Sequence, residues 1–426
     1  MTFNDLNLHA DIQKAVAEEG YTHPTPIQQQ AITPAIEGFD LVACAQTGTG
    51  KTAAFSIPIL DTLHRNSQYE NSKLKHITAL IVTPTRELAI QIDESIKTYG
   101  KYTQIKSLVI FGGVTQTAQV NALKKGIDIL VATPGRLLDL HNQGLVNIRQ
   151  IKQLVLDEAD QMLDMGFIHD VKKIIKIIPQ KRQTLLFSAT MPVAIQELAM
   201  SILTKPKYIS VTPVSSTAEK VEQKVYFVNK QNKRPLLTHL IKEENLKNVL
   251  VFTRTKHGAD NVVRYLTKNN ISSAAIHGDK SQNNRQRVLE GFKNKEINIL
   301  VATDIAARGI DIEQLPYVIN YDIPNISETY VHRIGRTGRA GNSGLAVSFC
   351  DTEEIPYLKD IEKLIKMSIT RVKEHPYPLQ EQEADTPQKP DFRHKKKPSG
   401  STHTARPASG TAKKPVNHWR KPKPKK

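Results

Sequence analysis

Short runs of β-branched and aliphatic residues alternate along this chain with longer segments of helical periodicity. In the first half, several of the short runs are apolar at every position, as buried parallel strands are. They predict strands at residues 41–44, 77–83, 108–111, 129–132, 154–156 and 184–187. Helices are predicted between them at residues 51–64, 86–98 and 167–178. This alternation predicts an α/β fold with a doubly wound parallel sheet.

The alternation stops at a polar segment and then starts again. After an apolar run at 209–211, the sequence TPVSSTAEK is polar, and we interpret residues 212–218 as a linker. Beyond it, strands are predicted at 225–228, 249–253, 274–277, 299–302, 318–321 and 345–349, with helices at 259–268 and 282–293. We therefore expect two α/β domains, at residues 1–211 and 219–375.

The composition changes again near the C-terminal end. Residues 386–426 hold 13 lysines and arginines, one acidic residue and seven prolines, so they carry +12 of the formal net charge of +17. Such a segment buries too little apolar surface to offset its ordering entropy, so we expect residues 376–426 to form a disordered basic tail. The charge predicts a polyanionic partner, with an anionic membrane as the weaker alternative.

Composition also limits the compartment. Cys44 and Cys350, the only cysteines, adjoin apolar runs and are expected to be reduced, partly buried thiols in a reducing compartment. The first residues, MTFNDLNLHADI, lack the basic and apolar regions of a secretory signal, and no apolar run is long enough for a bilayer span. We therefore expect a cytoplasmic protein with no membrane partner.

A glycine-rich string, AQTGTGKT at 45–52, follows one predicted strand and opens a predicted helix. In that context, Gly48 and Gly50 let backbone N–H groups converge on phosphates, Lys51 reaches the β- and γ-phosphates, and the Thr52 hydroxyl can ligate magnesium. The strict phosphate-loop pattern has glycine at its first position, where this chain has Ala45. An ordinary glycine-rich turn is the alternative.

Acidic residues follow another predicted strand, at Asp157-Glu158-Ala159-Asp160. Because Asp157 ends an apolar strand, we expect it at the carboxyl edge of the sheet, where it can hold magnesium directly or through water. Glu158 is placed to orient or deprotonate an attacking water. Taken alone, the four residues could also form a solvated acidic turn.

The second half contributes HRIGRTGR at 332–339, which has three arginines and no obvious local acidic partner. Cleavage of a γ-phosphate needs positive charge around the departing phosphoryl group, so the two halves are expected to come together on ATP. Arg336 and Arg339 could instead bind acids or RNA. Near the N-terminus, GYTHPTPIQ at 20–28 ends in Gln28, whose amide suits the edge of adenine.

Together these strings resemble the DEAD-box ATP-dependent RNA helicases of superfamily 2, over about residues 3–375. The resemblance is carried by Phe3, GYTHPTPIQ, AQTGTGKT, PTRELA (84–89), Gly112-Gly113, TPGR (133–136), DEAD (157–160), SAT (188–190), VFTRTK (251–256), IHGDKSQNNR (276–285), ATDIAARGID (302–311) and HRIGRTGR. The overall sequence of these motifs, together with the short basic tail, is most similar to the bacterial RhlE-like subgroup.

The resemblance implies two tandem RecA-like domains that ATP and single-stranded RNA draw together. It assigns adenine selection to Phe3, Tyr21 and Gln28, and nucleotide binding to Ala45, Gln46, Thr47, Gly48, Thr49, Gly50, Lys51 and Thr52. It gives magnesium to Thr52 and Asp157, water activation to Glu158, the ribose to Asp311, and the γ-phosphate to Arg336 and Arg339. Asp160, Ser188, Thr190 and His332 would couple hydrolysis to the contact between the domains.

The resemblance also assigns an RNA track. Its residues are Pro84, Thr85, Arg86, Gly113, Thr133, Gly135 and Arg136 in the first domain, and Arg254, Gly278 and Thr303 in the second. Arginines and threonine hydroxyls suit phosphate oxygens, and glycines allow close approach. Aromatic residues make up only 6% of the chain, and its single tryptophan, Trp419, lies in the tail, so we expect backbone recognition with little base specificity.

These observations predict an ATP-dependent RNA helicase, an RNA-stimulated ATPase that uses ATP and Mg2+ to clamp single-stranded RNA and to unwind short duplexes locally. A monomer is expected, and ribosomal or RNA-decay complexes are candidate partners. Two other functions stay open, a DNA-directed superfamily 2 motor and a non-catalytic RNA chaperone. Intact Lys51, Glu158 and Arg336 argue against the second of these.

Overall fold

The protein is described by a computed structural model that covers residues 1–46, 48–69, 76–211, 221–307, 312, 315–338 and 344–380. The expected linker at 212–218 lies outside the described residues, as does the tail from residue 381 onward. Three predicted site residues, Thr47, Asp311 and Arg339, lie outside them as well.

Residues before the expected linker form one lobe around a seven-stranded sheet in the order β3-β4-β2-β5-β6-β1-β7, in which neighbouring strands run parallel. Its strands are β1 (Leu41–Ala45), β2 (Ala79–Val82), β3 (Ser107–Ile110), β4 (Ile129–Ala132), β5 (Gln153–Leu156), β6 (Gln183–Ser188) and β7 (Lys207–Val211). Its helices are η1 (Phe3–Leu6), α1 (Ala10–Glu18), α2 (Pro26–Ile36), α3 (Lys51–Tyr69), α4 (Arg86–Tyr99), α5 (Thr117–Leu123), α6 (Pro134–Asn142), α7 (Ala159–Asp164), α8 (Ile168–Ile177) and α9 (Val193–Ile202).

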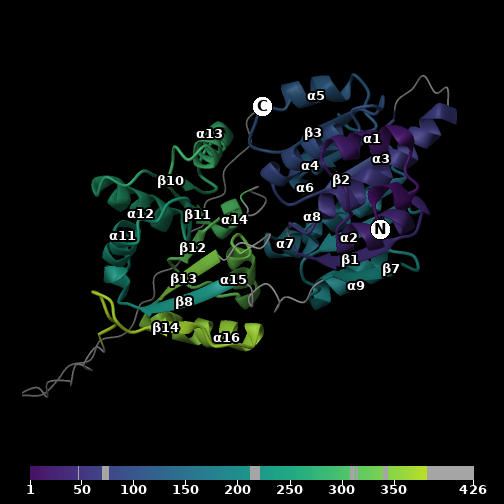
Figure 1. Cartoon of the computed structure of the whole chain (residues 1–426). Helices are drawn as coiled ribbons and strands as arrows, with labels where there is room; N and C mark the ends of the chain where they lie inside the picture. Colours follow the sequence, from purple (N-terminus) through teal and green to yellow (C-terminus); the bar gives the residue numbers. More distant parts are fainter. Residues whose placement is uncertain are drawn as a thin grey trace, which may run out of the picture. The chain divides into compact units, whose positions relative to one another are not determined.

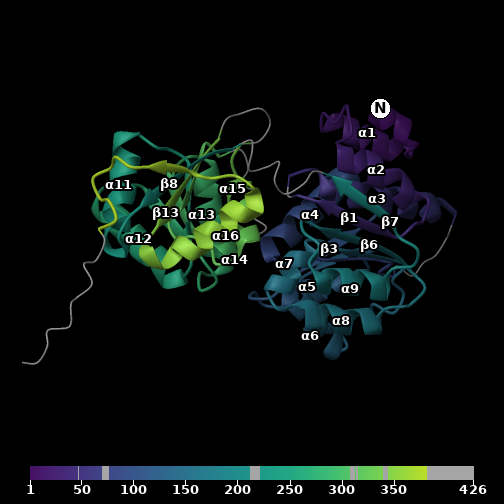
Figure 2. The same cartoon turned by 90° about the horizontal axis from the view of Figure 1, so that it is seen from below.

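The strands of this first lobe are apolar at consecutive positions because both faces of the sheet are buried. Ile81 and Val131 pack with α1 to α4, whereas their neighbours Leu80 and Leu130 pack with α6 to α9. Figure 1 labels these elements, and Figure 2 shows α1, α2 and α3 on one side of the sheet with α6, α8 and α9 on the other. The predicted doubly wound sheet is thereby confirmed.

The second lobe repeats the same architecture. Its parallel sheet has the order β10-β11-β9-β12-β13-β8-β14, which is the order of the first sheet with seven added to each strand number. The strands are β8 (Val221–Phe227), β9 (Val249–Thr253), β10 (Ser273–Ile276), β11 (Ile299–Thr303), β12 (Tyr317–Asn320), β13 (Gly344–Cys350) and β14 (Thr370–Val372). The helices are η2 (Lys230–Asn232), α11 (Lys233–Glu243), α12 (Lys256–Lys268), α13 (Gln282–Lys293), α14 (Asp304–Ala307), α15 (Ser327–Ile334), η3 (Thr352–Glu354) and α16 (Ile355–Ile365).

The end of the second lobe differs from the sequence-based expectation. Helix α16 and the edge strand β14 were not predicted, because the polar residues of β14 give no strand pattern and its three residues are too few to show a period. The packed chain also continues beyond residue 375. The backbone N–H of Leu379 donates to the carbonyl of Phe227 at 2.9 Å, and Tyr377 packs against the core beside α11.

The structure also shows the state of the two cysteines and the lengths of the apolar helices. Cys44 and Cys350 are both free thiols, with Cys44 half-buried and Cys350 buried. Within the described part of the chain, no helix has the length and apolar content that crossing a membrane requires.

Candidate functional site

The glycine-rich loop joins β1 to α3, and its backbone conformation depends on glycine. Gly48 and Gly50 have φ values of 78° and 93°, which side-chain-bearing residues rarely adopt. A Cβ atom on Gly50 would lie 2.4 Å from Nε2 of Gln28. That Nε2 donates to the Gly50 carbonyl at 3.2 Å, while Oε1 of Gln28 accepts the N–H of Thr25 at 2.9 Å. The amide predicted to select adenine is therefore hydrogen-bonded to the phosphate loop itself.

Lys51, the first residue of α3, forms a buried ion pair with Glu158. Its Nζ lies 2.6 Å from Oε1 of Glu158, and the two side chains are only 6% and 3% exposed. Burial disfavours the ammonium of Lys51, but the carboxylates of Glu158 and Asp157 outweigh it, so the Lys51 pKa lies above its ordinary value. The lysine therefore stays charged where it would meet phosphate.

Glu158 is held in an unusual backbone conformation at the start of α7. Its φ of 52° places a residue with a side chain in the left-handed region, and the residue precedes the first turn of the helix. Oε2 of Glu158 accepts a hydrogen bond from Nε2 of Gln161 at 2.9 Å. Gln161 was not identified from the sequence, although its position three residues after Glu158 on the same helix is a signal that could have found it.

Asp157 lies at the carboxyl end of β5, as predicted, and is 2% exposed. Burial and the charge of Glu158 raise the pKa of Asp157 to about 7. Its Oδ1 atom is buried and has no hydrogen-bond donor among the described residues. A buried carboxylate oxygen without a donor fits a bound cation, and oxygen ligands of this kind suit Mg2+. Asp157 and the Thr52 hydroxyl at the start of α3 are thus residues that could hold Mg2+.

A cavity of about 470 Å³ gathers these residues. Its wall includes the predicted nucleotide residues Tyr21, Gln28, Gly48, Gly50, Lys51, Thr52, Asp157 and Glu158, together with Arg336 from the second lobe. Arg336 follows α15 and is 6% exposed. An arginine from one lobe and a phosphate loop from the other therefore line a single cavity, as the sequence predicted.

Phe3 is placed differently from the other predicted adenine residues. It is 4% exposed, belongs to the core of the first lobe and is not part of the cavity wall. Its ring stacks with that of Tyr21, with 5.9 Å between centroids and 28° between planes. The hydroxyl groups of Tyr21 and Tyr99 are 3.2 Å apart, and burial raises the pKa of Tyr99. Phe3 thus packs against Tyr21, which lines the cavity, without lining the cavity itself.

Three of the four predicted coupling residues, Asp160, Ser188 and Thr190, form a hydrogen-bonded group beside the cavity. The backbone N–H of Asp160 donates to Oγ of Ser188 at 3.1 Å, and Oδ2 of Asp160 accepts the N–H and hydroxyl of Thr190 at 2.8 and 2.9 Å. Burial would raise the pKa of Asp160, but Lys51, His332 and Thr190 outweigh it and lower the pKa. The pKa of Asp160 therefore depends on charged groups of both the phosphate loop and α15.

A second hollow of about 470 Å³ brings together predicted RNA residues. It is lined by Pro84, Thr85, Arg86, Thr133, Gly135, Arg136 and Gly278, and also by Glu87 and Arg285. Several of these begin α4 or α6, and helix N-termini favour anions. Arg136 is held by Gln119 at 3.1 Å and by the Val114 carbonyl at 2.9 Å.

Gly113 is not part of that wall, but its backbone lies against the side chain of Arg86, which is. A Cβ atom on Gly113 would lie 2.3 Å from Nη2 of Arg86, and the glycine has a φ of 78°. The guanidinium of Arg86 therefore lies directly over the Gly113 backbone. The predicted contact of Gly113 with RNA stays a prediction; in this structure the group that lies close to its backbone is Arg86.

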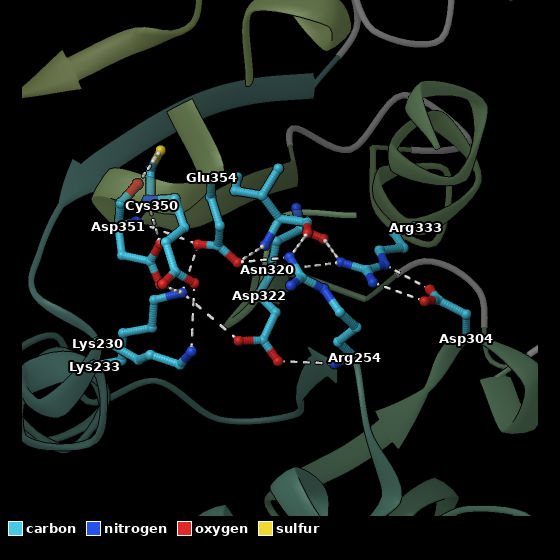
Figure 3. A network of polar contacts seen from close by, with 12 residues as sticks. Lys230, Lys233, Arg254, Asp304, Asn320, Asp322, Arg333, Cys350, Asp351 and Glu354 are labelled. Carbon is cyan, nitrogen blue, oxygen red and sulfur yellow. Dashed lines mark hydrogen bonds and ion pairs between the residues drawn. The ribbon is translucent and has the colours of Figure 1, made fainter. Parts of the chain in front are cut away.

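Arg254, a predicted RNA residue that lines neither cavity, belongs with Arg333 to a polar network of the second lobe (Figure 3). Nη2 of Arg254 donates to the Ile323 carbonyl at 2.8 Å and to Oε1 of Glu354 at 3.0 Å, and Oε2 of Glu354 accepts from the buried Lys233 at 2.6 Å. Arg254 stays 43% exposed. Thr303, also a predicted RNA residue, is buried at the end of β11 and is not in the second hollow's wall.

Arg333, the first arginine of HRIGRTGR, is structural. Its Nε and Nη2 donate to the two carboxylate oxygens of Asp304 at 2.6 and 2.8 Å, and its side chain is 1% exposed. The acidic partner lies 29 residues earlier, so no local pattern could reveal it. Only Arg336 of the described arginines in that string lines the ATP cavity.

A contact between α4 and α13 was also missed. Oε1 of Glu87 accepts from Nε2 of Gln282 at 3.0 Å and lies 3.0 Å from Nη2 of Arg285. Glu87 and Arg285 are 6% and 9% exposed, so this is a buried ion pair. Both lie in strings that carried the family resemblance, but no spacing rule pairs residues this far apart.

Two parallel α/β lobes, with a phosphate loop after β1, acidic residues after β5 and an arginine supplied by the second lobe, define a nucleoside triphosphatase of the tandem RecA-like class. The sequence profile of the DEAD/DEAH box helicases matches residues 25–198, and that of the helicase conserved C-terminal domain matches residues 231–341. The chain belongs to the DEAD-box ATP-dependent RNA helicases.

Similar proteins agree with this assignment. The ATP-dependent RNA helicase CshA of Limosilactobacillus reuteri is 43% identical over 373 residues, which cover 88% of this chain and 74% of that protein. The DEAD-box helicase RhpA of Helicobacter pylori is 42% identical over 368 residues, 86% of this chain and 73% of that one. Among solved structures, Mss116p bound to single-stranded RNA and AMP-PNP has a TM-score of 0.78 at 31% identity, covering 88% of this chain and 80% of that one. S. cerevisiae Dbp5 bound to RNA and ADP BeF3 has a TM-score of 0.76 at 31% identity, covering 87% and 95%.

Proposed function

We propose that this helicase hydrolyses ATP in the cavity between Lys51 and Arg336, and that hydrolysis controls a clamp on single-stranded RNA that opens short duplexes locally. The observation that carries the proposal is the shared wall of that cavity, which combines the phosphate loop, Glu158 and an arginine of the second lobe. Charge supplied from a separate lobe makes turnover conditional on the arrangement of both lobes.

Each residue then has a distinct task. Backbone N–H groups around Gly48 and Gly50 hold the phosphates, and the Lys51 ammonium neutralises the β- and γ-phosphates. Glu158, whose second carboxylate oxygen is fixed by Gln161, orients the attacking water and accepts its proton. Arg336, with Arg339, stabilises the charge that develops on the γ-phosphate. Tyr21, backed by Phe3, and Gln28 select adenine, and Asp311 meets the ribose.

Magnesium belongs to the same proposal. Asp157 and Thr52 would hold Mg2+, which when bound would neutralise negative charge on the phosphates. The buried Oδ1 atom of Asp157 without a donor among the described residues supports this assignment.

RNA is proposed to follow the second hollow. Arg86, Arg136, Thr85 and Thr133 would bind phosphate oxygens along it, and Arg254 would extend the track in the second lobe. The neighbours Mss116p and Dbp5 were solved with RNA bound, which supports RNA as the partner. The coupling between the nucleotide state and RNA binding would run through four residues, Asp160, Ser188, Thr190 and His332.

The remaining assignments follow the sequence. We propose a first domain at 1–211, a linker at 212–218, and a second domain that starts at 219 and extends past the expected end at 375 to include Tyr377 and Leu379. The basic tail that follows is proposed to add sequence-independent RNA affinity. We propose a cytoplasmic monomer with ribosomal or RNA-decay complexes as partners. The RhlE-like subgroup stays a prediction, since the relatives described above carry the names CshA and RhpA.

The deciding experiment is ATP turnover by the full chain without nucleic acid and with single-stranded RNA, single-stranded DNA or duplex RNA. The proposal expects strong stimulation by single-stranded RNA and little by DNA. Equal stimulation by single-stranded DNA would favour a DNA-directed motor. Unwinding of a short duplex that persists without ATP would favour a non-catalytic chaperone.

A further inference from the structure

A group of metal-ligating side chains lies on the first lobe among residues that the ATP and RNA sites do not use. His9 and Asp11 stand at the start of α1, and His64 lies on α3. One ligand atom from each residue lies within 4.8 Å of the ligand atoms of the other two. The three residues thus bring two imidazole nitrogens and one carboxylate oxygen to one point.

The spacing of these atoms approaches that of a coordination shell. Oδ2 of Asp11 is 2.9 Å from Nε2 of His64 and 3.5 Å from Nδ1 of His9. Ligand atoms about 2.0–2.2 Å from a tetrahedral zinc ion lie about 3.3 Å from one another. The two imidazole rings are perpendicular, with 4.4 Å between their centroids.

The surrounding structure holds the cluster in place. The backbone N–H of His9 donates to Oδ1 of Asp61 at 2.5 Å, and Asp61 is fully buried and also binds Nε of Arg65 at 2.6 Å. Nδ1 of His9 accepts the backbone N–H of Asp11 at 3.3 Å, and a metal ion would replace that N–H as the partner of the nitrogen lone pair. Supporting contacts of this kind orient ligands before a metal arrives.

We infer that His9, Asp11 and His64 form a zinc-binding site that joins α1 to α3. Two imidazoles and a carboxylate suit Zn2+ far better than Mg2+, so the magnesium used with ATP would not compete for the site. The side chains of His9, Asp11 and His64 are 24%, 42% and 10% exposed, which leaves one side open for a water as fourth ligand.

A zinc ion at this site would connect the N-terminal segment to α3, the helix that starts at the phosphate loop. His64 lies on α3, whose first residue is Lys51, while η1 and α1 carry the segment that includes Phe3. An ion bridging the two elements adds a link between the N-terminal segment and this helix. Because zinc binds only the folded arrangement, it stabilises the first lobe in proportion to its concentration above the dissociation constant.

The test is a zinc titration of the full chain by isothermal calorimetry, after removal of metals by a chelator and with magnesium present. We expect one saturable site, absent in His64→Gln and weakened at least about tenfold in Asp11→Asn. His23→Gln, an exposed histidine outside the cluster, is the matched control and should bind as the original chain does. Equal zinc binding by the original chain and His64→Gln would overturn the inference, because the chain has 14 histidines in all.

Thermal unfolding gives a second readout. Zinc should raise the melting temperature of the original chain and of His23→Gln but not of His64→Gln or His9→Gln. Circular dichroism establishes that each variant is folded before titration, and His9→Gln, at the more exposed position, serves if His64→Gln is not folded. An equal zinc-dependent rise in His9→Gln and in the original chain would contradict the site.

Discussion

The ammonium of Lys51 and the carboxylate of Glu158 are 2.6 Å apart in a nearly fully buried ion pair. In the proposed mechanism, the group that binds phosphate therefore also neutralises the group that activates water. A γ-phosphate that attracts Lys51 would weaken this pair, and the released carboxylate oxygen of Glu158 could then accept a proton from water. Gln161 keeps the other oxygen fixed. In this way the Lys51–Glu158 ion pair would link nucleotide binding to activation of the base.

Glu158→Gln should separate ATP binding from hydrolysis. The amide keeps the size of the carboxylate but cannot accept a proton, so turnover should fall by about 10²–10⁴-fold while ATP still binds. Glu94, in the wall of the same cavity, allows the same substitution as a control, and Glu94→Gln should keep its turnover. Steady-state ATPase and fluorescent-nucleotide binding measure the two steps. Turnover by Glu158→Gln within a few fold of the original rate would contradict the role of Glu158.

Gly113→Ala should weaken RNA binding without weakening ATP binding. The added methyl would occupy the place of the Arg86 guanidinium and would strain a backbone with φ of 78°. We expect about a tenfold loss of RNA affinity, equivalent to about 1.4 kcal/mol. Gly144→Ala is the matched control, since Gly144 has a φ of 71° and lines neither hollow, and nothing lies within 4 Å of its added Cβ. Fluorescence anisotropy with single-stranded RNA distinguishes them, and equal affinities for the two variants would refute the explanation.

Arg285→Ala should reduce the coupling between RNA and ATP. The substitution leaves the buried Glu87 with Gln282 as its remaining donor from α13, which disfavours the contact between α4 and α13. The RNA concentration for half-maximal ATPase stimulation should rise roughly tenfold, within the usual range of coupling free energies. Arg287→Ala, two residues along the same helix and exposed, should leave it unchanged. A normal RNA dependence in Arg285→Ala would show that this ion pair does not contribute.

Deletion of residues 386–426 should flatten the salt dependence of RNA binding. This segment carries a formal charge of +12, and its phosphate contacts release counterions from RNA. RNA affinity should fall at low salt, while ATP turnover at saturating RNA should stay unchanged. Binding measured across a series of salt concentrations gives the slope. An unchanged slope would exclude the tail as an electrostatic RNA site.

Sequence reasoning succeeded where local pattern determines local structure. Consecutive apolar positions in β1 and β5 predicted buried parallel strands, and the glycines and carboxylates that follow them were placed correctly at the sheet edge. Phosphate chemistry predicted that arginines of the second half would lie near the phosphate loop, and the family resemblance singled out Arg336, which lines that cavity.

It failed where a role depends on partners distant in sequence. Arg333 and Arg336 stand three residues apart in one string, yet Arg333 is held by Asp304 and only Arg336 lines the ATP cavity. The Glu87–Arg285 pair joins different lobes, so no periodicity within either lobe could indicate it. Phe3 was grouped with the adenine residues, whereas its burial depends on how η1 packs.

Arg336→Ala gives the most direct test of the claim that two lobes build one ATP site. The measurement is ATP turnover with and without single-stranded RNA, alongside nucleotide affinity and circular dichroism to establish that the variant binds ATP and is folded. Removal of the arginine should lower the RNA-stimulated rate by about 10³–10⁵-fold while ATP binding to the first lobe persists. An RNA-stimulated rate close to that of the original chain would contradict the account.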